Sequence, residues 1–527
     1  MNEVSDPAAV HAVDRRGAAA AICIAILLVS TSFALYGDVN LNLADEGFLW
    51  YGAERTIAGE VPLRDFQSYE PGRYYWISLG SVFLGDGLLS LRLSVAIFQA
   101  IGLAFALLVV RRIVVHPGWL LPIGILMLLW MFPRYKAFDA SLSMMAVYMG
   151  MRLLEAETWK PYFAAGVFVG LAGFFGRNHA LYAGLGISAL TLWRHWDRDE
   201  EALGSRIGSL VAGGLVGALP MAAMVLFVPG FAVSLWESVV FFVEHGANLP
   251  ASAPLPWRVD YAGLEWRVAT AHFLLGCSFL LVPVVYLLGA VIALRRGRDE
   301  SSHRRVLVAA TALGVFYLHH AAVRSDATHL AESIQPALLA ALAIPGAFGL
   351  LGSRARFGAV WGAIVVITLA VTPYANSEVA LLGQAQTVTL VPLDVAGDRL
   401  RVSRGTAGWA SRIQVAVARH VGEEDALFIA PYTPGLYPLL GKTSPVWEIY
   451  LLWAANEDRQ QEMIARLERK NVDWALISSG AIDKKDELRF WNTHDRVWAH
   501  LKQTFEIVPE PQLPEGMMLL RRREGSS

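Results

Sequence analysis

Long apolar stretches recur along the chain, and they constrain its fold more than any other feature. A helix needs about 20 apolar residues to cross a bilayer, and eleven stretches reach or approach that length. They lie at 17–36, 91–110, 119–132, 141–154, 161–176, 180–193, 207–229, 268–294, 306–322, 336–351 and 357–373. With 55% hydrophobic and 17% charged residues, the chain lies outside the range of soluble proteins. The sequence therefore predicts a polytopic α-helical membrane protein with about 11 transmembrane helices.

Charge and cysteine content exclude several functions. The formal net charge is −2, so no basic surface indicates a nucleic-acid partner. Cys23 and Cys277 both fall inside apolar stretches and lack metal-binding or redox spacing. Arg15 and Arg16 precede the first apolar stretch, as in a signal peptide, but that stretch is long and other spans follow it. We therefore expect an uncleaved first helix.

Basic residues between the apolar stretches predict the orientation of the chain. They fall in alternate connections, which the positive-inside rule places in the cytoplasm. These residues are Arg15, Arg16, Arg111, Arg112, Lys160, Arg194, Arg198, Arg206, Arg295, Arg296, Arg298, Arg304, Arg305, Arg354 and Arg356. We expect a cytoplasmic N-terminus at 1–16, a transmembrane domain at 17–373, and an extracytoplasmic loop at 37–90.

The segment 374–527 is predicted to be an extracytoplasmic α/β domain. Strand-like runs at 387–393, 425–430, 472–478, 505–508 and 517–520 alternate with helical stretches near 408–421, 456–470 and 495–503. The segment has no phosphate-binding glycine loop, paired-cysteine site or nucleophile elbow. We therefore assign it no chemistry from the sequence.

The first outward loop carries two adjacent carboxylates, Asp45 and Glu46. Residues 46–58 have the spacing of a short amphipathic helix that lies along the bilayer surface, and Gly59 is expected to end it. A carboxylate at the rim of an apolar cavity can act as a general base on a hydroxyl group. The alternative is that Asp45 simply caps the helix by accepting backbone N–H bonds.

Cations and histidines gather in the outward connections at otherwise apolar depth, where ionisable groups are costly and often functional. They are Arg73, Arg134, Lys136, Arg177, His179, His319, His320, Arg324 and His329, and Asp139 and Asp326 lie among them. A lipid phosphate is a suitable ligand for such a group, because Arg and Lys both bind phosphate. The alternatives are snorkelling to the interface, pairing with the two aspartates, or a zinc site of histidines with Asp326, although no two histidines show a known metal-binding spacing.

Four motifs in this order resemble the bacterial membrane glycosyltransferases of the GT-C fold, a group that includes protein O-mannosyltransferases and the lipid A aminoarabinose transferase. The motifs are Asp45-Glu46 with the following 59–66 and Pro71-Gly72, the run 134–139 that opens a helix, the segment 166–185 containing Arg177, and the run 324–330 that leads to Pro336. The resemblance covers most of the membrane part of the chain.

The resemblance implies a transferase of a hexosyl or pentosyl group from a polyprenyl-phosphate-linked donor to an acceptor hydroxyl, in the bacterial inner membrane. It implies inversion by direct displacement, with Asp45 as general base and Glu46 in support. Candidate ligands of the donor phosphate are Arg73, Arg134, Lys136, Arg177 and Arg324. Candidate substrate-binding residues are His179, Asp139, Asp326 and His329. No cofactor or metal is expected, with a divalent metal as the disfavoured alternative, and the acceptor is a glycan, lipid or protein.

The chain departs from the family pattern at one motif. Relatives often place a basic residue or histidine just before Pro-Pro, whereas this chain has Tyr69-Glu70-Pro71-Gly72. We expect Arg73 to supply the charge from the other side.

Two other classes of function remain open at the level of the sequence. A lipid-linked glycan flippase should show repeat symmetry and ionisable residues near the bilayer midplane, whereas here they gather at one face. A sensor or scaffold whose tail is the active part would leave the first-loop carboxylates unexplained.

Overall fold

The computed structural model describes residues 7–114, 116–198, 203–246, 248–295, 301–349, 354–383 and 389–524. The chain forms two compact units, each assembled from separate stretches. The first comprises Met1–Gly37, Leu93–Phe227 and Asn248–Gly383, and the second comprises Asp38–Arg92, Val228–Ala247 and Gln384–Ser527. A few predicted features lie outside the described residues, namely the basic residues Arg296 and Arg298, positions 1–6 of the N-terminal segment and the first two residues of the strand expected at 387–393.

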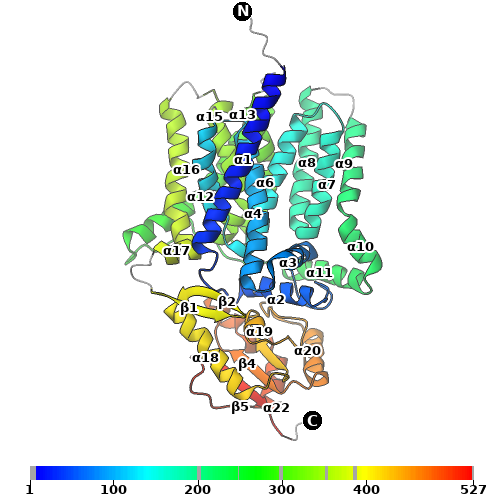
Figure 1. The fold of residues 1–527 in the computed structure, drawn as a ribbon, viewed down its shortest axis with the longest axis vertical. Coiled ribbons are helices and arrows are strands. Elements are labelled where there is room, and N and C mark those ends of the chain that lie inside the picture. Colours follow the sequence, from blue (N-terminus) through cyan, green and yellow to red (C-terminus); the bar gives the residue numbers. More distant parts are fainter. Residues whose placement is uncertain are drawn as a thin grey trace, which may run out of the picture. The chain divides into compact units, whose positions relative to one another are not determined.

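The first unit is built from helices (Figure 1). They are α1 (Pro7–Tyr36), most of α4 (Leu88–Val110), η1 (Pro117–Trp119), α5 (Leu120–Leu129), η2 (Arg134–Lys136), α6 (Ala137–Leu154), α7 (Lys160–Phe175), α8 (Arg177–Arg198), α9 (Leu203–Gly217), α10 (Leu219–Phe227), α12 (Trp266–Leu294), α13 (Ser302–Val323), α14 (Ala327–Ser333), α15 (Gln335–Ala347), α16 (Arg354–Ala375) and α17 (Ser377–Gly383). Each of the eleven apolar stretches coincides with helix in the described residues.

By length and composition, five of the described helices qualify as membrane spans, or up to eight if each of three bent pairs is one span. The expected eleven exceeds this number for identifiable reasons. The stretches 119–132 and 141–154 belong to one bent pair, with an angle of 104° between its helices. Helix α7 has only 16 residues, and α8 begins and ends with arginines. The chain is a polytopic helical membrane protein, as predicted.

Helices α7 and α9 pack closely because glycines line their contact. A Cβ atom on Gly213 of α9 would lie 2.1 Å from the carbonyl oxygen of Phe163, and one on Gly166 of α7 would lie 2.1 Å from that of Leu210. Neither position has room for a side chain. Small residues bring backbones together in this way in membrane helix pairs, where lipid provides no hydrophobic driving force.

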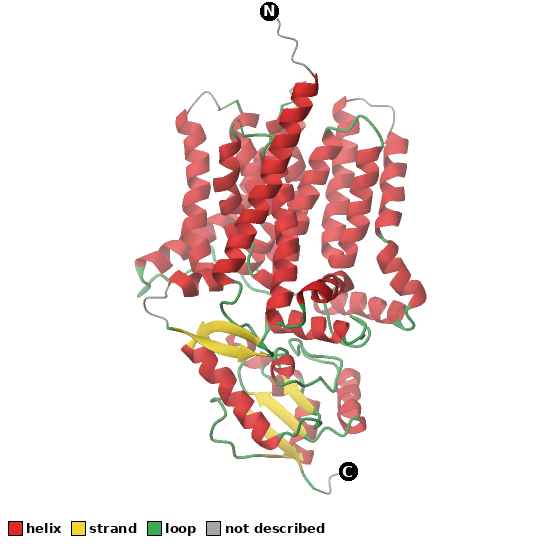
Figure 2. Ribbon diagram, viewed as in Figure 1, coloured by secondary structure: helices red, strands yellow, loops and turns green. Residues whose placement is uncertain are grey.

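The second unit contains all the strands of the described residues (Figure 2). A four-stranded sheet has the order β3-β4-β6-β5, with β3 and β4 parallel and the other pairs antiparallel. Strands β1 and β2 form a separate antiparallel hairpin. The strands are β1 (Leu390–Val395), β2 (Asp398–Ser403), β3 (Leu427–Ala430), β4 (Trp474–Ser478), β5 (Phe505–Ile507) and β6 (Met517–Arg522).

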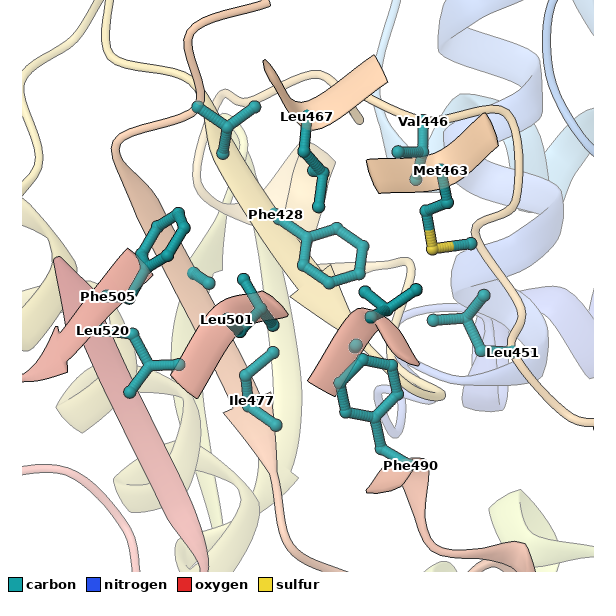
Figure 3. Packing of buried hydrophobic residues seen from close by; sticks show 14 residues of the cluster. Phe428, Val446, Leu451, Met463, Leu467, Ile477, Phe490, Leu501, Phe505 and Leu520 are labelled. Atoms are coloured by element: carbon teal, nitrogen blue, oxygen red, sulfur yellow. The ribbon is translucent and has the colours of Figure 1, made fainter. Parts of the chain in front are cut away.

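The helices that accompany the sheet are α18 (Arg404–His420), α19 (Leu436–Leu439), α20 (Glu457–Arg469), α21 (Phe490–Thr493) and α22 (Asp495–Thr504), with short 3₁₀ turns η4 (Ile482–Lys484) and η5 (Asp486–Leu488). The predicted α/β character of this segment and its three longest helices are confirmed. Strand β2 was not expected. The core of this α/β segment contains Phe428 of β3, Met463 and Leu467 of α20 and Leu501 of α22 (Figure 3). All four side chains are at most 1% exposed.

Three further helices of the second unit come from connections between the apolar stretches, namely α2 (Asp45–Ile57), α3 (Pro71–Leu84) and α11 (Phe231–His245). Helix α2 and its end are confirmed, because Gly59 follows it with a φ of +93°. Its apolar face does not rest on lipid as expected, since Phe48 and Tyr51 are buried against aromatic rings of the same unit. Helix α3 was not expected from the sequence, and Pro71 occupies its first turn.

Candidate active site

Asp45 is the first residue of α2, and the preceding residue holds the N-cap position. Ala44 occupies the N-cap position and makes no side-chain capping bond. The side-chain oxygen of Asn42 instead accepts the backbone N–H groups of Ala44 and Asp45, each at 3.0 Å. Asp45 therefore lies one position after the N-cap, and Asn42 stabilises the first turn.

Two tyrosines from the C-terminal segment donate hydrogen bonds to Asp45. The hydroxyl of Tyr432 lies 3.0 Å from Oδ1 of Asp45, and the hydroxyl of Tyr450 binds the same oxygen. The two rings stack with centroids 4.6 Å apart. Both partners lie within the second unit, nearly 400 positions beyond Asp45 in the chain.

A close backbone approach holds the C-terminal segment against the start of α2. The N–H of Gly435 donates to the carbonyl of Leu43 at 2.9 Å. A Cβ atom on Gly47 would lie 2.5 Å from the backbone nitrogen of Gly435, so no larger residue fits at position 47. The two stretches therefore pack backbone to backbone beside Asp45.

Aromatic rings extend from Asp45 toward Arg73. Phe48 contacts Tyr450 and Tyr69, with ring centroids 4.9 Å and 4.8 Å apart. The guanidinium of Arg73 lies over the Tyr69 ring at 4.9 Å, and Arg73 is 3% exposed. This geometry is a cation–π contact. The structure thus brings two predicted site residues, Asp45 and Arg73, into one unit and links them through these rings.

Glu46 differs from its neighbour, because its carboxylate is buried in an ion pair. Arg92 binds it through two hydrogen bonds, Nε to Oε1 at 2.9 Å and Nη2 to Oε2 at 2.7 Å. The two side chains are 2% and 1% exposed. Arg92 also donates to the carbonyl of Asn40. Of the two adjacent carboxylates, only Asp45 is partly exposed.

The remaining predicted site residues belong to the first unit. Arg134 donates to Glu378 at 2.8 Å and to the carbonyl oxygens of Tyr36 and Gly37 at 3.1 Å. These bonds tie the start of η2 to α1 and α17.

Asp139 and His179 form a buried pair rather than an open subsite. The Nε2 atom of His179 lies 2.5 Å from Oδ1 of Asp139, and its Nδ1 atom lies 3.1 Å from the hydroxyl of Tyr317. All three side chains are 1–2% exposed. The substrate contact expected for His179 and Asp139 stays a prediction. Arg177 lies two residues before His179, at the start of α8.

The histidines around α14 are tied to carboxylates. His320 bonds Glu332 at 2.7 Å, and Asp326 accepts from His329 at 2.8 Å and from Arg324 at 2.9 Å. Burial acts to raise the pKa of Asp326, but the bonds from His329 and Arg324 outweigh burial and lower it to about 2. Asp326 is therefore ionised at neutral pH.

The positive charge of Lys136 attracts the carboxylate of Glu332, which is the partner of His320. Separately, the hydroxyl of Tyr182 lies 2.8 Å from Nδ1 of His319. Within the described ranges, no group of three or more His, Cys, Asp or Glu residues is arranged to hold a metal ion.

Tyr432, Tyr450 and Arg92 were not predicted from the sequence. The tyrosines carry no local motif, and only the fold brings them to Asp45. Arg92 did carry a signal, because an arginine near the start of the apolar stretch 91–110 requires a partner.

A first unit of bilayer-length helices and a second unit with an α/β domain define a polytopic membrane protein of the GT-C fold. The structure is similar to the crystal structure of ArnT from Cupriavidus metallidurans bound to undecaprenyl phosphate. The TM-score is 0.51 at 14% sequence identity, and the match covers 96% of this chain and 98% of that chain. This likeness shows the fold.

Two further solved structures are similar at lower scores. The apo state of the same ArnT has a TM-score of 0.47 at 15% identity, covering 95% of this chain and 98% of that one. The Archaeoglobus fulgidus oligosaccharyltransferase complex with Zn and sulfate has a TM-score of 0.41 at 12% identity, covering 86% and 68%. The sequence matches no protein-family model and no curated protein.

Proposed function

We propose that this protein is a glycosyltransferase that moves a sugar from a polyprenyl-phosphate-linked donor to an acceptor hydroxyl on the extracytoplasmic face of a bacterial inner membrane. The observation that carries the proposal is the contrast between two adjacent carboxylates. Arg92 binds the buried carboxylate of Glu46, while Asp45 is partly exposed at the start of α2. A fold similar to that of ArnT bound to undecaprenyl phosphate supports a lipid-phosphate donor.

In the proposed reaction, the acceptor oxygen attacks the anomeric carbon from the face opposite the lipid phosphate. The new carbon–oxygen bond forms as the anomeric carbon–phosphate oxygen bond breaks, and polyprenyl phosphate leaves with the bonding electron pair. The carboxylate of Asp45 accepts the proton of the acceptor hydroxyl. The configuration at the anomeric carbon inverts.

Negative charge develops on the leaving phosphate, so fixed cations lower the barrier more than they strengthen donor binding. Arg73, Arg134, Lys136, Arg177 and Arg324 are the proposed cations. Arg134 and Arg324 already bind Glu378 and Asp326, so a phosphate would join existing ion pairs there. Removing one cation that contacts the transition state is expected to raise the barrier by about 2–4 kcal/mol.

The test of this proposal is release of free polyprenyl phosphate by the purified full chain in nanodiscs, supplied with a panel of polyprenyl-phosphate sugars. Release that depends on one donor would support the transferase and identify the sugar. The acceptor would then be sought among glycans, lipids and proteins. No release from any donor, combined with donor translocation in liposomes, would favour a flippase instead.

A further inference from the structure

The C-terminal α/β segment contributes two hydroxyl groups to the environment of Asp45. Tyr432 follows β3 by two residues, and Tyr450 lies in the loop that precedes α20. Both donate to Oδ1 of Asp45. Neither tyrosine belongs to the loop that supplies the carboxylate. The C-terminal segment therefore contacts the first turn of α2 from a distant part of the sequence.

Neighbouring groups fix the positions of both tyrosines. Their rings stack on each other, and Phe48 packs against Tyr450. Burial, with a further contribution from the adjacent Asp45 carboxylate, raises the pKa of both tyrosines above its ordinary value of 10.0. Both hydroxyls are therefore protonated donors at neutral pH, where an ionised carboxylate needs donors.

Two bonds to one carboxylate oxygen restrict the rotation of the Asp45 side chain. They fix the direction in which Oδ2 points, and a general base must meet its proton within hydrogen-bond reach. A misplacement of about 1 Å can reduce the rate on the order of a hundredfold. Such positioning would act on the chemical step and not on donor binding.

We propose that Tyr432 and Tyr450 are positioning residues for Asp45, so that the C-terminal α/β domain completes the active site. This inference rests on the proposed function of Asp45. It assigns a role to a domain in which the sequence shows no catalytic motif.

Tyr432→Phe and Tyr450→Phe test the inference, because each variant keeps the ring and its stacking and removes only the donor. We expect kcat to fall on the order of tenfold to a hundredfold, with KM for the donor unchanged. Tyr437→Phe is the matched control. Its hydroxyl lies in the same segment and accepts from the N–H of Ile429 at 2.9 Å. We expect this control to lower the unfolding temperature and to leave kcat near that of the wild type.

The possible outcomes separate this inference from the proposed function. Wild-type protein that releases no polyprenyl phosphate would contradict the proposed function. An active wild type with Tyr432→Phe and Tyr450→Phe variants as active as Tyr437→Phe would overturn the inference alone.

Hydrogen exchange gives a second test that does not depend on turnover. Asp45→Ala should accelerate amide exchange in residues 432–450, because both hydroxyls lose their acceptor. Asp65→Ala is the control, since Asp65 pairs with Arg64 on the surface of the same unit. Exchange in 432–450 that is the same in both variants would overturn the inference.

Discussion

The guanidinium of Arg92 binds both carboxylate oxygens of Glu46, one residue after Asp45, and the pair is almost completely buried. The pair joins the first turn of α2 to the N-terminal part of α4. We propose that it supports Asp45 by fixing the backbone from which Asp45 projects.

Arg92→Met is expected to destabilise the protein by about 3–5 kcal/mol, because it leaves Glu46 buried without a partner. The double variant Glu46→Leu with Arg92→Met should recover much of that loss, since no charge is then left unpaired. Unfolding temperature in detergent is the measurement. Arg64→Ala removes a more exposed ion pair from the same unit and should cost less than about 1 kcal/mol. Equal losses for Arg92→Met and Arg64→Ala would contradict this account of the buried pair.

Asn42→Ala should cost about 1 kcal/mol of stability, because two backbone N–H groups at the start of α2 lose their acceptor. Asn42→Asp keeps a side-chain oxygen in place and should retain most of the stability. Thermal unfolding of both variants checks this. A loss in Asn42→Asp as large as that in Asn42→Ala would show that the capping bond is not the cause.

Glu54 of α2 should make stability depend on pH. Burial raises the pKa of this carboxyl from 4.5 to about 7, despite the opposing effects of Trp50 and Arg55. Between these two values the folded state holds a proton that the unfolded chain has released, so stability falls as pH rises from about 4.5 to about 7. Glu54→Gln removes this dependence. Unfolding temperatures at pH 5 and pH 8 should therefore differ less in the variant than in the wild type, and an unchanged difference would argue against a protonated Glu54.

Gly213→Ala should destabilise the contact between α7 and α9 by about 1–3 kcal/mol, because the added methyl meets the carbonyl oxygen of Phe163. Gly208→Ala is the control on the same helix, since no atom lies within 4 Å of the added methyl. The control should be neutral or slightly stabilising. If both variants unfold at the same temperature, the close approach of the two helices is not important for stability.

The sequence predicted the helices well because the membrane requires long apolar stretches. The amphipathic α2 and most strands of the C-terminal domain also followed from periodicity. Helix α3 was missed because Pro71 and Gly72 are typical of a turn, yet a proline is equally favourable at the start of a helix. Strand β2 was missed, although Leu400 and Val402 alternate with Arg399 and Arg401 as in a half-buried strand.

The candidate site was only partly predictable. Asp45 and Arg73 stand out as charged residues in a loop between two apolar stretches. The burial of His179 and Asp139 depends on how α6, α8 and α13 pack, and the contacts of Tyr432 and Tyr450 depend on the fold of the C-terminal domain. Neither is encoded in a local pattern.

In the proposed function, Asp45 is the general base of a sugar transfer from a lipid phosphate. The most direct measurement compares wild type and Asp45→Asn for donor binding and for release of polyprenyl phosphate, using the donor that the panel identifies. We expect Asp45→Asn to bind the donor about as well as the wild type and to release no polyprenyl phosphate. Turnover by Asp45→Asn at a rate near that of the wild type would contradict this role of Asp45.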